Sequence, residues 1–120
     1  MKYVDGFVTA VAEADREKYL AFARRAWRIF KELGAISTVE NWGEDVPKGK
    51  ITDFHRAVQA TAGEAIVFSW ITWPDKATRD AAMRVMMSDA TMDQIGPMPF
   101  DGARMIFGGF STIYTSEDDK

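Results

Sequence analysis

The sequence contains no cysteine and a single histidine among its 120 residues. Without cysteine the chain can form neither a disulfide framework nor a thiolate site for zinc or an iron–sulfur cluster. A histidine-only metal site would need more ligands than His55 supplies, and the carboxylates of Glu40, Asp45, Asp53 and Asp101 follow no recognised metal-loop spacing. We therefore expect neither a bound metal nor a cofactor.

The sequence also lacks the short motifs of several enzyme classes. It has no G-x-S-x-G nucleophile motif, no second histidine for a related hydrolase site, and no Gly-rich phosphate loop. An excess of positive charge is missing too, because 15 Lys and Arg residues face 18 Asp and Glu residues, for a net charge of -3. Basic groups make most of the affinity for nucleic acids and anionic membranes, so we expect neither as a partner.

Long apolar runs are absent from the start of the sequence. The first such run is interrupted at Asp5 and again at Glu13, too early for the core of a signal peptide or for a membrane span. Together with the lack of cysteine, this pattern favours a cytoplasmic protein.

The chain does contain enough apolar material for one core. Hydrophobic residues make up 47% of it and aromatic residues 12%, while 28% of the residues are charged, as in an ordinary soluble domain. A chain of 120 residues leaves no room for a second core. We expect a single domain over residues 1–114, followed by a flexible acidic tail over residues 115–120.

The periodicity of the sequence indicates alternating strands and helices. Apolar residues between Asp15 and Gly34 recur every three or four positions, which predicts an amphipathic helix capped by Asp15 and stopped at Gly34. A second helix is expected over Lys76–Ser88, where Pro74 ends a strand and Asp75 is the N-cap. The other patterns predict strands at Tyr3–Val11, Ile36–Trp42, Thr52–Ala60, Ala65–Trp73 and Arg104–Tyr114.

This order of elements predicts an α+β domain with a ferredoxin-like split βαβ arrangement, an antiparallel sheet and both helices on one face. The strands Tyr3–Val11 and Ala65–Trp73 are apolar on both faces, so the face without helices also needs a cover. A second copy of the chain is the simplest cover. We therefore expect a homodimer that pairs sheet to sheet.

Four long motifs resemble those of the YbaA-like family of small bacterial proteins, a domain of unknown function. The resemblance covers roughly Met1 to Thr112 and rests on MKYVDGFV, ENWGEDVPKGKITDF, VFSWITWPDKATRDAAM and MPFDGARMIFGGF. It implies a ferredoxin-like fold that pairs as a dimeric α/β barrel, and it implies no particular reaction. The wider barrel group includes cofactor-free monooxygenases, isomerases, haem-binding enzymes and decolorising peroxidases, which for this chain is an analogy of fold alone.

The stretch Pro97–Phe110 concentrates residues with special backbone properties. Its Asp-Gly pair predicts a turn before a last strand that begins at Arg104. Gly108 and Gly109 inside that strand indicate a bend or bulge, or the close approach of another group. Because arginine keeps its charge, we expect Arg104 to pair with a carboxylate, either Asp101 or Glu40.

Two kinds of site fit these residues. In the first, a small apolar or aromatic ligand binds in a cleft between sheet and helices. In the second, the same cleft is that of a cofactor-independent enzyme, similar to a monooxygenase or isomerase, in which His55 or a carboxylate moves a proton. The ligand-binding candidates are the aromatic walls Trp42, Trp70 and Phe100 and the polar groups Glu40, Asp101 and Arg104.

Two further interpretations stay open. His55 is expected on a strand on the same side as Asp53, where it is either a surface histidine beside a carboxylate or a proton shuttle. The whole protein could also be a purely structural dimeric interaction module. Burial of Glu40 and Arg104 would favour a site, whereas exposure of every polar candidate would favour the module.

Overall fold

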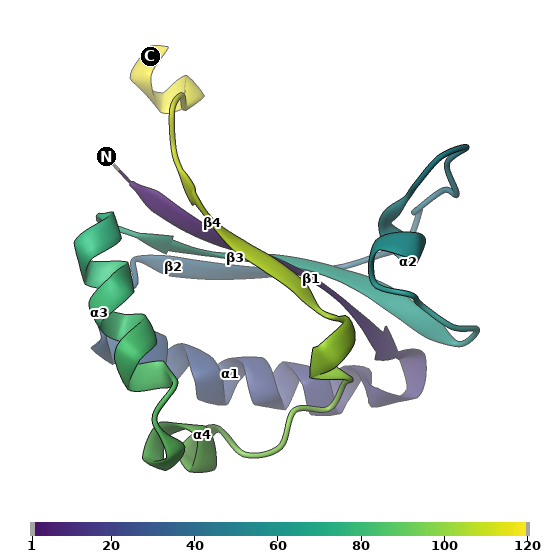
Figure 1. The fold of residues 1–120 in the computed structure, drawn as a ribbon, viewed down its shortest axis with the longest axis horizontal. Helices are drawn as coiled ribbons and strands as arrows, with labels where there is room; N and C mark the ends of the chain where they lie inside the picture. The colour runs from purple at the N-terminus through teal and green to yellow at the C-terminus, as the bar shows by residue number, and fades with distance from the viewer. Residues whose placement is uncertain (1, 120) are drawn as a thin grey trace.

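A four-stranded antiparallel sheet forms the centre of the fold, in a computed structural model that describes residues 2–119. Its strands are β1 (Tyr3–Ala12), β2 (Ser37–Trp42), β3 (Glu64–Trp73) and β4 (Ile106–Ser111). The order across the sheet is β2-β3-β1-β4, so the two long strands are central and the two short ones are edges (Figure 1). This order confirms the expected ferredoxin-like topology.

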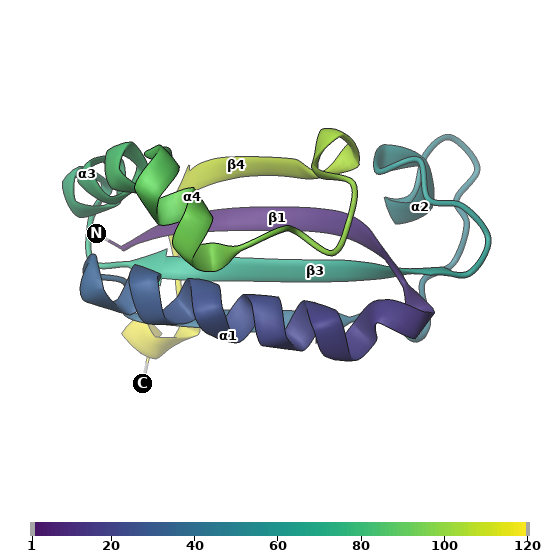
Figure 2. The same ribbon diagram turned by 90° about the horizontal axis from the view of Figure 1, so that it is seen from below.

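Three helices lie on one side of the sheet, and the face on that side is called the helix face (Figures 1 and 2). They are α1 (Arg16–Glu32), α3 (Lys76–Met86) and α4 (Asp89–Ile95). Asp75 caps α3 as expected, because its carboxylate accepts a hydrogen bond of 2.7 Å from the backbone N–H of Thr78. Asp15 precedes α1, but its side chain makes no capping hydrogen bond.

The main core lies between α1 and the helix face. The apolar stripe of α1 brings Tyr19 and Ala26 against the sheet, where both are buried. Val67 and Trp73 of β3 meet this layer and are almost completely buried. Gly34 follows the helix with a φ of +107°, which explains why glycine stands at this stop.

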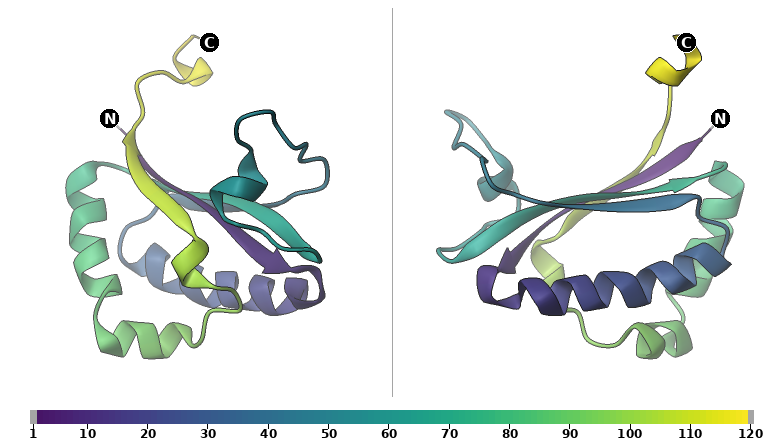
Figure 3. Two further views of the ribbon diagram at one scale, coloured as in Figure 1. Left: turned by 45° about the vertical axis from the view of Figure 1, so that its right-hand side comes forward. Right: turned by 180° about the vertical axis from the view of Figure 1, so that it is seen from behind.

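Residues 43–63 connect β2 to β3 and lie on the side of the sheet opposite the helix face. We call that side the open face (Figures 1 and 3). Val58 of this excursion is fully buried against Val8, Ala10 and Ile66, so it covers one end of the open face. The rest of that face has no such cover among residues 2–119. It carries an open groove of about 430 Å³, the open-face groove, lined in part by Val4, Phe68, Trp70, Ile106 and Phe110.

The expected strand Thr52–Ala60 is wrong, because this segment contains the short helix α2 (Phe54–Ala57). Asp53 accepts hydrogen bonds from the backbone N–H groups of Arg56 and Gly49, and this local capping overrides the apparent alternation. Since α2 lies on the open face, the segment adds no strand to the sheet.

The start of the last strand also differs from expectation. Arg104 lies in a 3₁₀ turn, Gly102–Arg104, and β4 begins two residues later at Ile106. Gly108 and Gly109 pair with Gly6 and Asp5 in unbroken register, so no bulge is present in β4.

The chain beyond β4 includes a further 3₁₀ turn, Ser116–Asp119, in which Asp119 accepts a hydrogen bond from the Tyr114 hydroxyl. Flexibility of this tail stays a prediction, and Lys120 lies outside the described residues. Within residues 2–119, no helix combines the length and the apolar character that crossing a bilayer requires. The cytoplasmic location likewise stays a prediction.

Candidate functional site

Glu40 is the polar centre of the candidate site. Alternation along β2 turns Thr38, Glu40 and Trp42 toward the helix face, and Glu40 stands opposite Ser69 of β3. The buried hydroxyl of Tyr19, from α1, donates a hydrogen bond of 2.6 Å to Glu40 Oε1. A carboxyl group, a phenol and a serine hydroxyl therefore meet between helix and sheet.

The surroundings change the acid–base properties of this group. Burial raises the pKa of Glu40, and the hydrogen bonds from Tyr19 and Ser69 only partly offset that effect. Burial and the neighbouring Glu40 charge also raise the pKa of Tyr19, which therefore stays a hydrogen-bond donor. Glu40 is thus a better proton acceptor than a solvated glutamate, and Tyr19 fixes one of its oxygens.

Aromatic rings surround this polar centre. The Phe100 ring lies 5.8 Å from the Tyr19 ring and 5.7 Å, edge to face, from the Phe22 ring. Trp42 packs on the same cluster, and the guanidinium of Arg16 lies 5.4 Å from the Trp42 ring centre. The combination of one ionisable group with several rings is typical of sites for small aromatic molecules.

One more polar group faces the same interior. Thr9 of β1 stands opposite Val67, on the helix face, and is 2% exposed. Within the described residues its hydroxyl has no hydrogen-bond partner, which is unusual for a buried oxygen.

The structure brings together three of the expected site residues, Glu40, Trp42 and Phe100. Trp70 is not with them, because it lies one position from Ser69 on β3 and therefore points to the open face, where it lines the open-face groove. An aromatic wall shared by Trp42 and Trp70 is excluded, since the sheet lies between them.

Asp101 and Arg104 form a separate cluster at the start of β3. Arg104 donates to both carboxylate oxygens of Glu64, at 2.9 and 2.8 Å, and to Asp101 at 3.1 Å. It also donates to the backbone carbonyl of Gln59 at 2.9 Å. The expected pairing with Asp101 is confirmed, while the alternative partner Glu40 is wrong and Glu64 was missed. Glu64 carried no sequence signal, because its partner is 40 residues away.

His55 lies on α2 rather than on a strand, on the opposite side of the sheet from Glu40. Its Nε2 atom is 2.8 Å from the carbonyl oxygen of Val46, so the ring ties the excursion 43–63 together. A role of His55 in proton transfer stays a prediction with no geometric support near Glu40.

Sequence reasoning missed Tyr19, Ser69 and Thr9. Tyr19 had the spacing of an ordinary core residue of the α1 stripe. Ser69 and Thr9 did give a weak signal, because each is a hydroxyl residue inside an otherwise apolar strand pattern.

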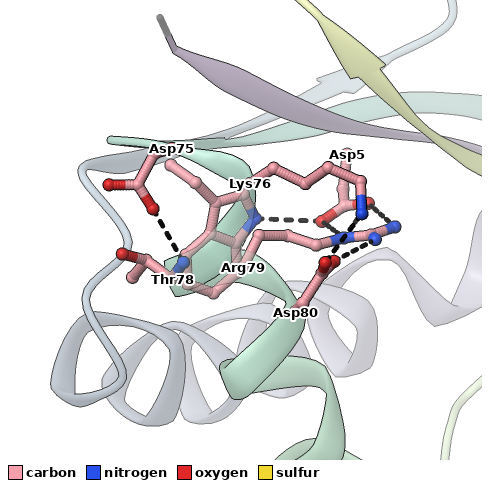
Figure 4. Close-up of polar contacts among 7 residues, drawn as sticks. Asp5, Asp75, Lys76, Thr78, Arg79 and Asp80 are labelled. Carbon is pink, nitrogen blue, oxygen red and sulfur yellow. Dashed lines mark hydrogen bonds and ion pairs between the residues drawn. The ribbon is translucent and has the colours of Figure 1, made fainter.

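A second polar cluster on the helix face is saturated (Figure 4). Arg79 of α3 donates to both oxygens of the buried Asp5, and the indole N–H of Trp73 donates to Asp5 at 2.9 Å. Asp80 accepts from Arg79 at 2.9 Å and from Lys76 at 2.7 Å. Because these groups satisfy one another, the cluster is a structural clamp between α3 and the sheet. Across residues 2–119, no group of three or more His, Asp or Glu side chains is placed to hold a metal ion.

The fold and the site together define an α+β protein with a ferredoxin-like antiparallel sheet and a partly buried carboxyl group between helix and sheet. Residues 2–102 match the model of the family described as protein of unknown function (DUF1428), and the chain belongs to this family. The uncharacterised protein YbaA of Escherichia coli K12 is 54% identical over 114 residues, which cover 94% of this chain and 97% of YbaA. YbaA of Shigella flexneri is similar to the same extent.

Among solved structures, the chain is similar to a variant of SnoaB, a cofactor-independent oxygenase from Streptomyces nogalater. The TM-score is 0.60 with 13% sequence identity, and the likeness covers 95% of each chain. At this identity the likeness shows the shared fold alone.

Proposed function

We propose that the protein binds a small aromatic molecule on the helix face of the sheet. The molecule carries an acidic hydrogen, and Glu40 accepts a hydrogen bond from it. The observation that carries the proposal is the Tyr19–Glu40 hydrogen bond of 2.6 Å inside a cluster of aromatic rings. Tyr19 donates to Oε1 of the carboxylate, and Oε2 keeps lone pairs that would accept a hydrogen bond from the ligand. The neighbouring rings of Tyr19 and Phe22 supply flat apolar surface for an aromatic body.

A matched pair of probes tests this proposal. 2-Naphthol carries an acidic hydroxyl, whereas naphthalene has the same ring system without it. The wild-type protein should prefer 2-naphthol by roughly tenfold to a hundredfold, since a hydrogen bond to a charged group contributes about 1.5–3 kcal/mol. Binding can be followed by calorimetry at a pH well above the raised pKa of Glu40.

Glu40→Gln keeps the shape of the side chain and removes its charge, so it should strongly reduce the preference for 2-naphthol while naphthalene binding stays the same. Glu17→Gln, on the exposed side of α1, is the matched control and should keep the wild-type preference. Equal affinity of wild-type protein for both probes would contradict the proposal.

The second candidate function is cofactor-independent catalysis, in which Glu40 removes a proton from the bound molecule rather than only accepting a hydrogen bond from it. Two observations favour it, namely the raised pKa of Glu40 and the fold shared with SnoaB, itself described as a cofactor-independent oxygenase. In this step the C–H bond of an enolisable substrate breaks, Glu40 takes the proton, and the electron pair stays on the substrate as an enolate. In heavy water the protein should speed deuterium exchange into 2-tetralone, measured by NMR, and Glu40→Gln should remove the acceleration. Exchange at the buffer rate would exclude this activity for that substrate type.

We infer in addition that the protein is a homodimer joined through its open faces. The open-face groove is apolar, and Phe68 and Phe110 in it are 45% and 62% exposed, which is a large exposure for such side chains. A second copy presents the same apolar surface and can cover both grooves at once, with a buried area above roughly 1,000 Å² in total. If the protein has a purely structural role, it should form this dimer but show no Glu40-dependent preference for 2-naphthol over naphthalene.

A further inference from the structure

The aromatic ring of Phe100 fills the centre of the candidate site. It touches the rings of Tyr19 and Phe22 and belongs to the cluster that Val11 and Val67 form on the helix face. Unlike these neighbours, Phe100 comes from neither a helix nor a strand. Its position therefore depends on an irregular segment of chain.

That segment, Gly96–Gly102, which we call the strap, runs alongside α1 between α4 and the 3₁₀ turn before β4 (Figure 2). Pro97 and Pro99 have no N–H group to donate. In the part of the chain that the structure describes, residues 97–100 make no backbone hydrogen bond. The middle of the strap is thus held by side-chain packing alone.

Both ends of the strap are anchored. At the first end, Arg25 Nε donates a hydrogen bond of 2.8 Å to the carbonyl of Ile95. At the other end, Asp101 accepts from the N–H of Ala103 at 3.0 Å and from Arg104. Gly96 has a φ of +84°, a conformation that glycine adopts without strain, so the chain can turn there. Fixed ends and an unbonded middle are what a movable strap requires.

The contact between the strap and α1 is incomplete. A hollow of about 330 Å³ lies between them, lined by Lys18, Ala21 and Arg25 from α1 and by Pro97, Met98 and Pro99 from the strap. On its inner side the strap is attached through Phe100, whose ring is only partly buried. Loss of the Phe100 contacts would release the inner side of the strap.

We propose that Phe100 is a displaceable occupant of the ligand site, and that the aromatic ring of the ligand takes its place between Tyr19 and Phe22 as the strap moves out. This inference rests on the proposed function and narrows the ligand class. The ligand has a single aromatic ring or two fused rings, the size range that can replace a phenylalanine side chain. Its acidic hydrogen lies on the side that faces Glu40.

The proposal makes an unusual prediction about affinity. A closed strap competes with the ligand, so the apparent dissociation constant is the intrinsic one divided by the fraction of open protein. Phe100→Ala removes the competing ring and should bind 2-naphthol at least about tenfold more tightly than the wild type, with faster association. If Phe100 were instead a wall of the site, its truncation would weaken binding.

Phe30→Ala is the matched control. Phe30 is also a partly buried ring, packed edge to face against Trp73 at 6.2 Å, but it belongs to a regular helix outside the candidate site. Its truncation should leave the affinity for 2-naphthol at the wild-type value. Phe100→Leu, which keeps an apolar side chain and supports folding if the alanine variant does not fold, should give a smaller gain of the same sign.

The outcomes separate this proposal from the proposed function. A gain confined to the Phe100 variants supports displacement. Unchanged or weaker binding by these variants, or an equal gain in Phe30→Ala, overturns it, while a Glu40-dependent preference for 2-naphthol would leave the proposed function intact. If wild-type protein and every variant fail to bind 2-naphthol, both are overturned.

Discussion

Gly109 of β4 lies so close to Tyr3 of β1 that a Cβ atom at position 109 would stand 2.5 Å from the Tyr3 hydroxyl oxygen. The same atom would stand 2.7 Å from Nη2 of Arg79. The phenol and the guanidinium also stack, with 5.2 Å between the Arg79 guanidinium carbon and the Tyr3 ring centre. Glycine at this position therefore makes room for the clamp between α3 and the sheet.

Gly109→Ala should destabilise the fold by about 1–3 kcal/mol, because the new methyl group forces Tyr3 or Arg79 out of place. Gly108→Ala is the matched control. Its Cβ would lie 3.5 Å from the Phe110 ring, an ordinary contact, so this variant should unfold near the wild-type temperature. Denaturant unfolding followed by circular dichroism measures both, and equal stability of the two variants would contradict this role of Gly109.

Arg79→Ala should cost about 3–5 kcal/mol of stability, the usual effect of removing one partner from a buried ion pair. Asp5 is 3% exposed, and without Arg79 its buried carboxylate would keep only the hydrogen bond from the Trp73 indole N–H within this cluster. Arg79→Lys should recover part of the loss, since lysine restores charge but not the two-pronged geometry. Lys76→Ala removes an exposed ion pair beside the same cluster and should leave the Tm almost unchanged. A similar loss in both alanine variants would argue against burial as the cause.

The acid stability of the protein should depend on Glu64. Hydrogen bonds from Arg104, and then from Thr61, lower the pKa of Glu64 from its usual 4.5 to about 2 in the folded state. A carboxylate with a depressed folded-state pKa stabilises the protein above its unfolded-state pKa, and this stabilisation is lost as the pH falls through the window from about 4.5 to about 2.

Thermal melts at several pH values check this. Glu64→Gln should flatten the decline of Tm across that window, whereas Glu17→Gln on the surface of α1 should decline like the wild type. A wild-type Tm that does not fall across the window, or a Glu64→Gln profile parallel to it, would show that the pair does not contribute.

Phe68→Glu should convert the protein to a monomer at low micromolar concentration, because it places a charge in the apolar lining of the open-face groove. Met87→Glu also replaces an exposed apolar residue, at the end of α3 on the helix side, and should leave the dimer intact. Sedimentation equilibrium distinguishes the two states. A wild-type monomer in this experiment would contradict the dimer itself.

Much of the fold could be predicted because its signals are local. The helical stripe of α1, the Asp75 cap of α3 and the nearly continuous apolar run of β3 each depend on residues close together in sequence. The prediction of a strand over Thr52–Ala60 was wrong because it also relied on a local pattern alone. Its alternation looked like a strand, but the capping bonds of Asp53 and the burial of Val58 required a short helix on the open face.

The candidate site could be predicted only in part. Alternation placed Glu40 and Trp42 on one face of β2, and the structure agrees. Alternation also puts Trp70 on the opposite face from Trp42, but only once the register of β3 against β2 is known. That register depends on how the two strands pair and cannot be obtained from either strand alone. The partner of Arg104 was likewise misjudged in part, because Asp101 was near in sequence and Glu64 was not.

The sequence by itself determined the two-layer α+β class, both main helices, the apolar character of both sheet faces and the membership in one family, because periodicity and long motifs are read along the chain. Only the tertiary structure decided that Tyr19 bonds to Glu40, that Phe100 fills the space beside them, and that Arg79 clamps α3 to Asp5. The two hydrogen-bonded pairs, Tyr19–Glu40 and Arg79–Asp5, are 21 and 74 positions apart in the sequence. Their geometry depends on how the elements pack in three dimensions, which no local pattern of residue types encodes.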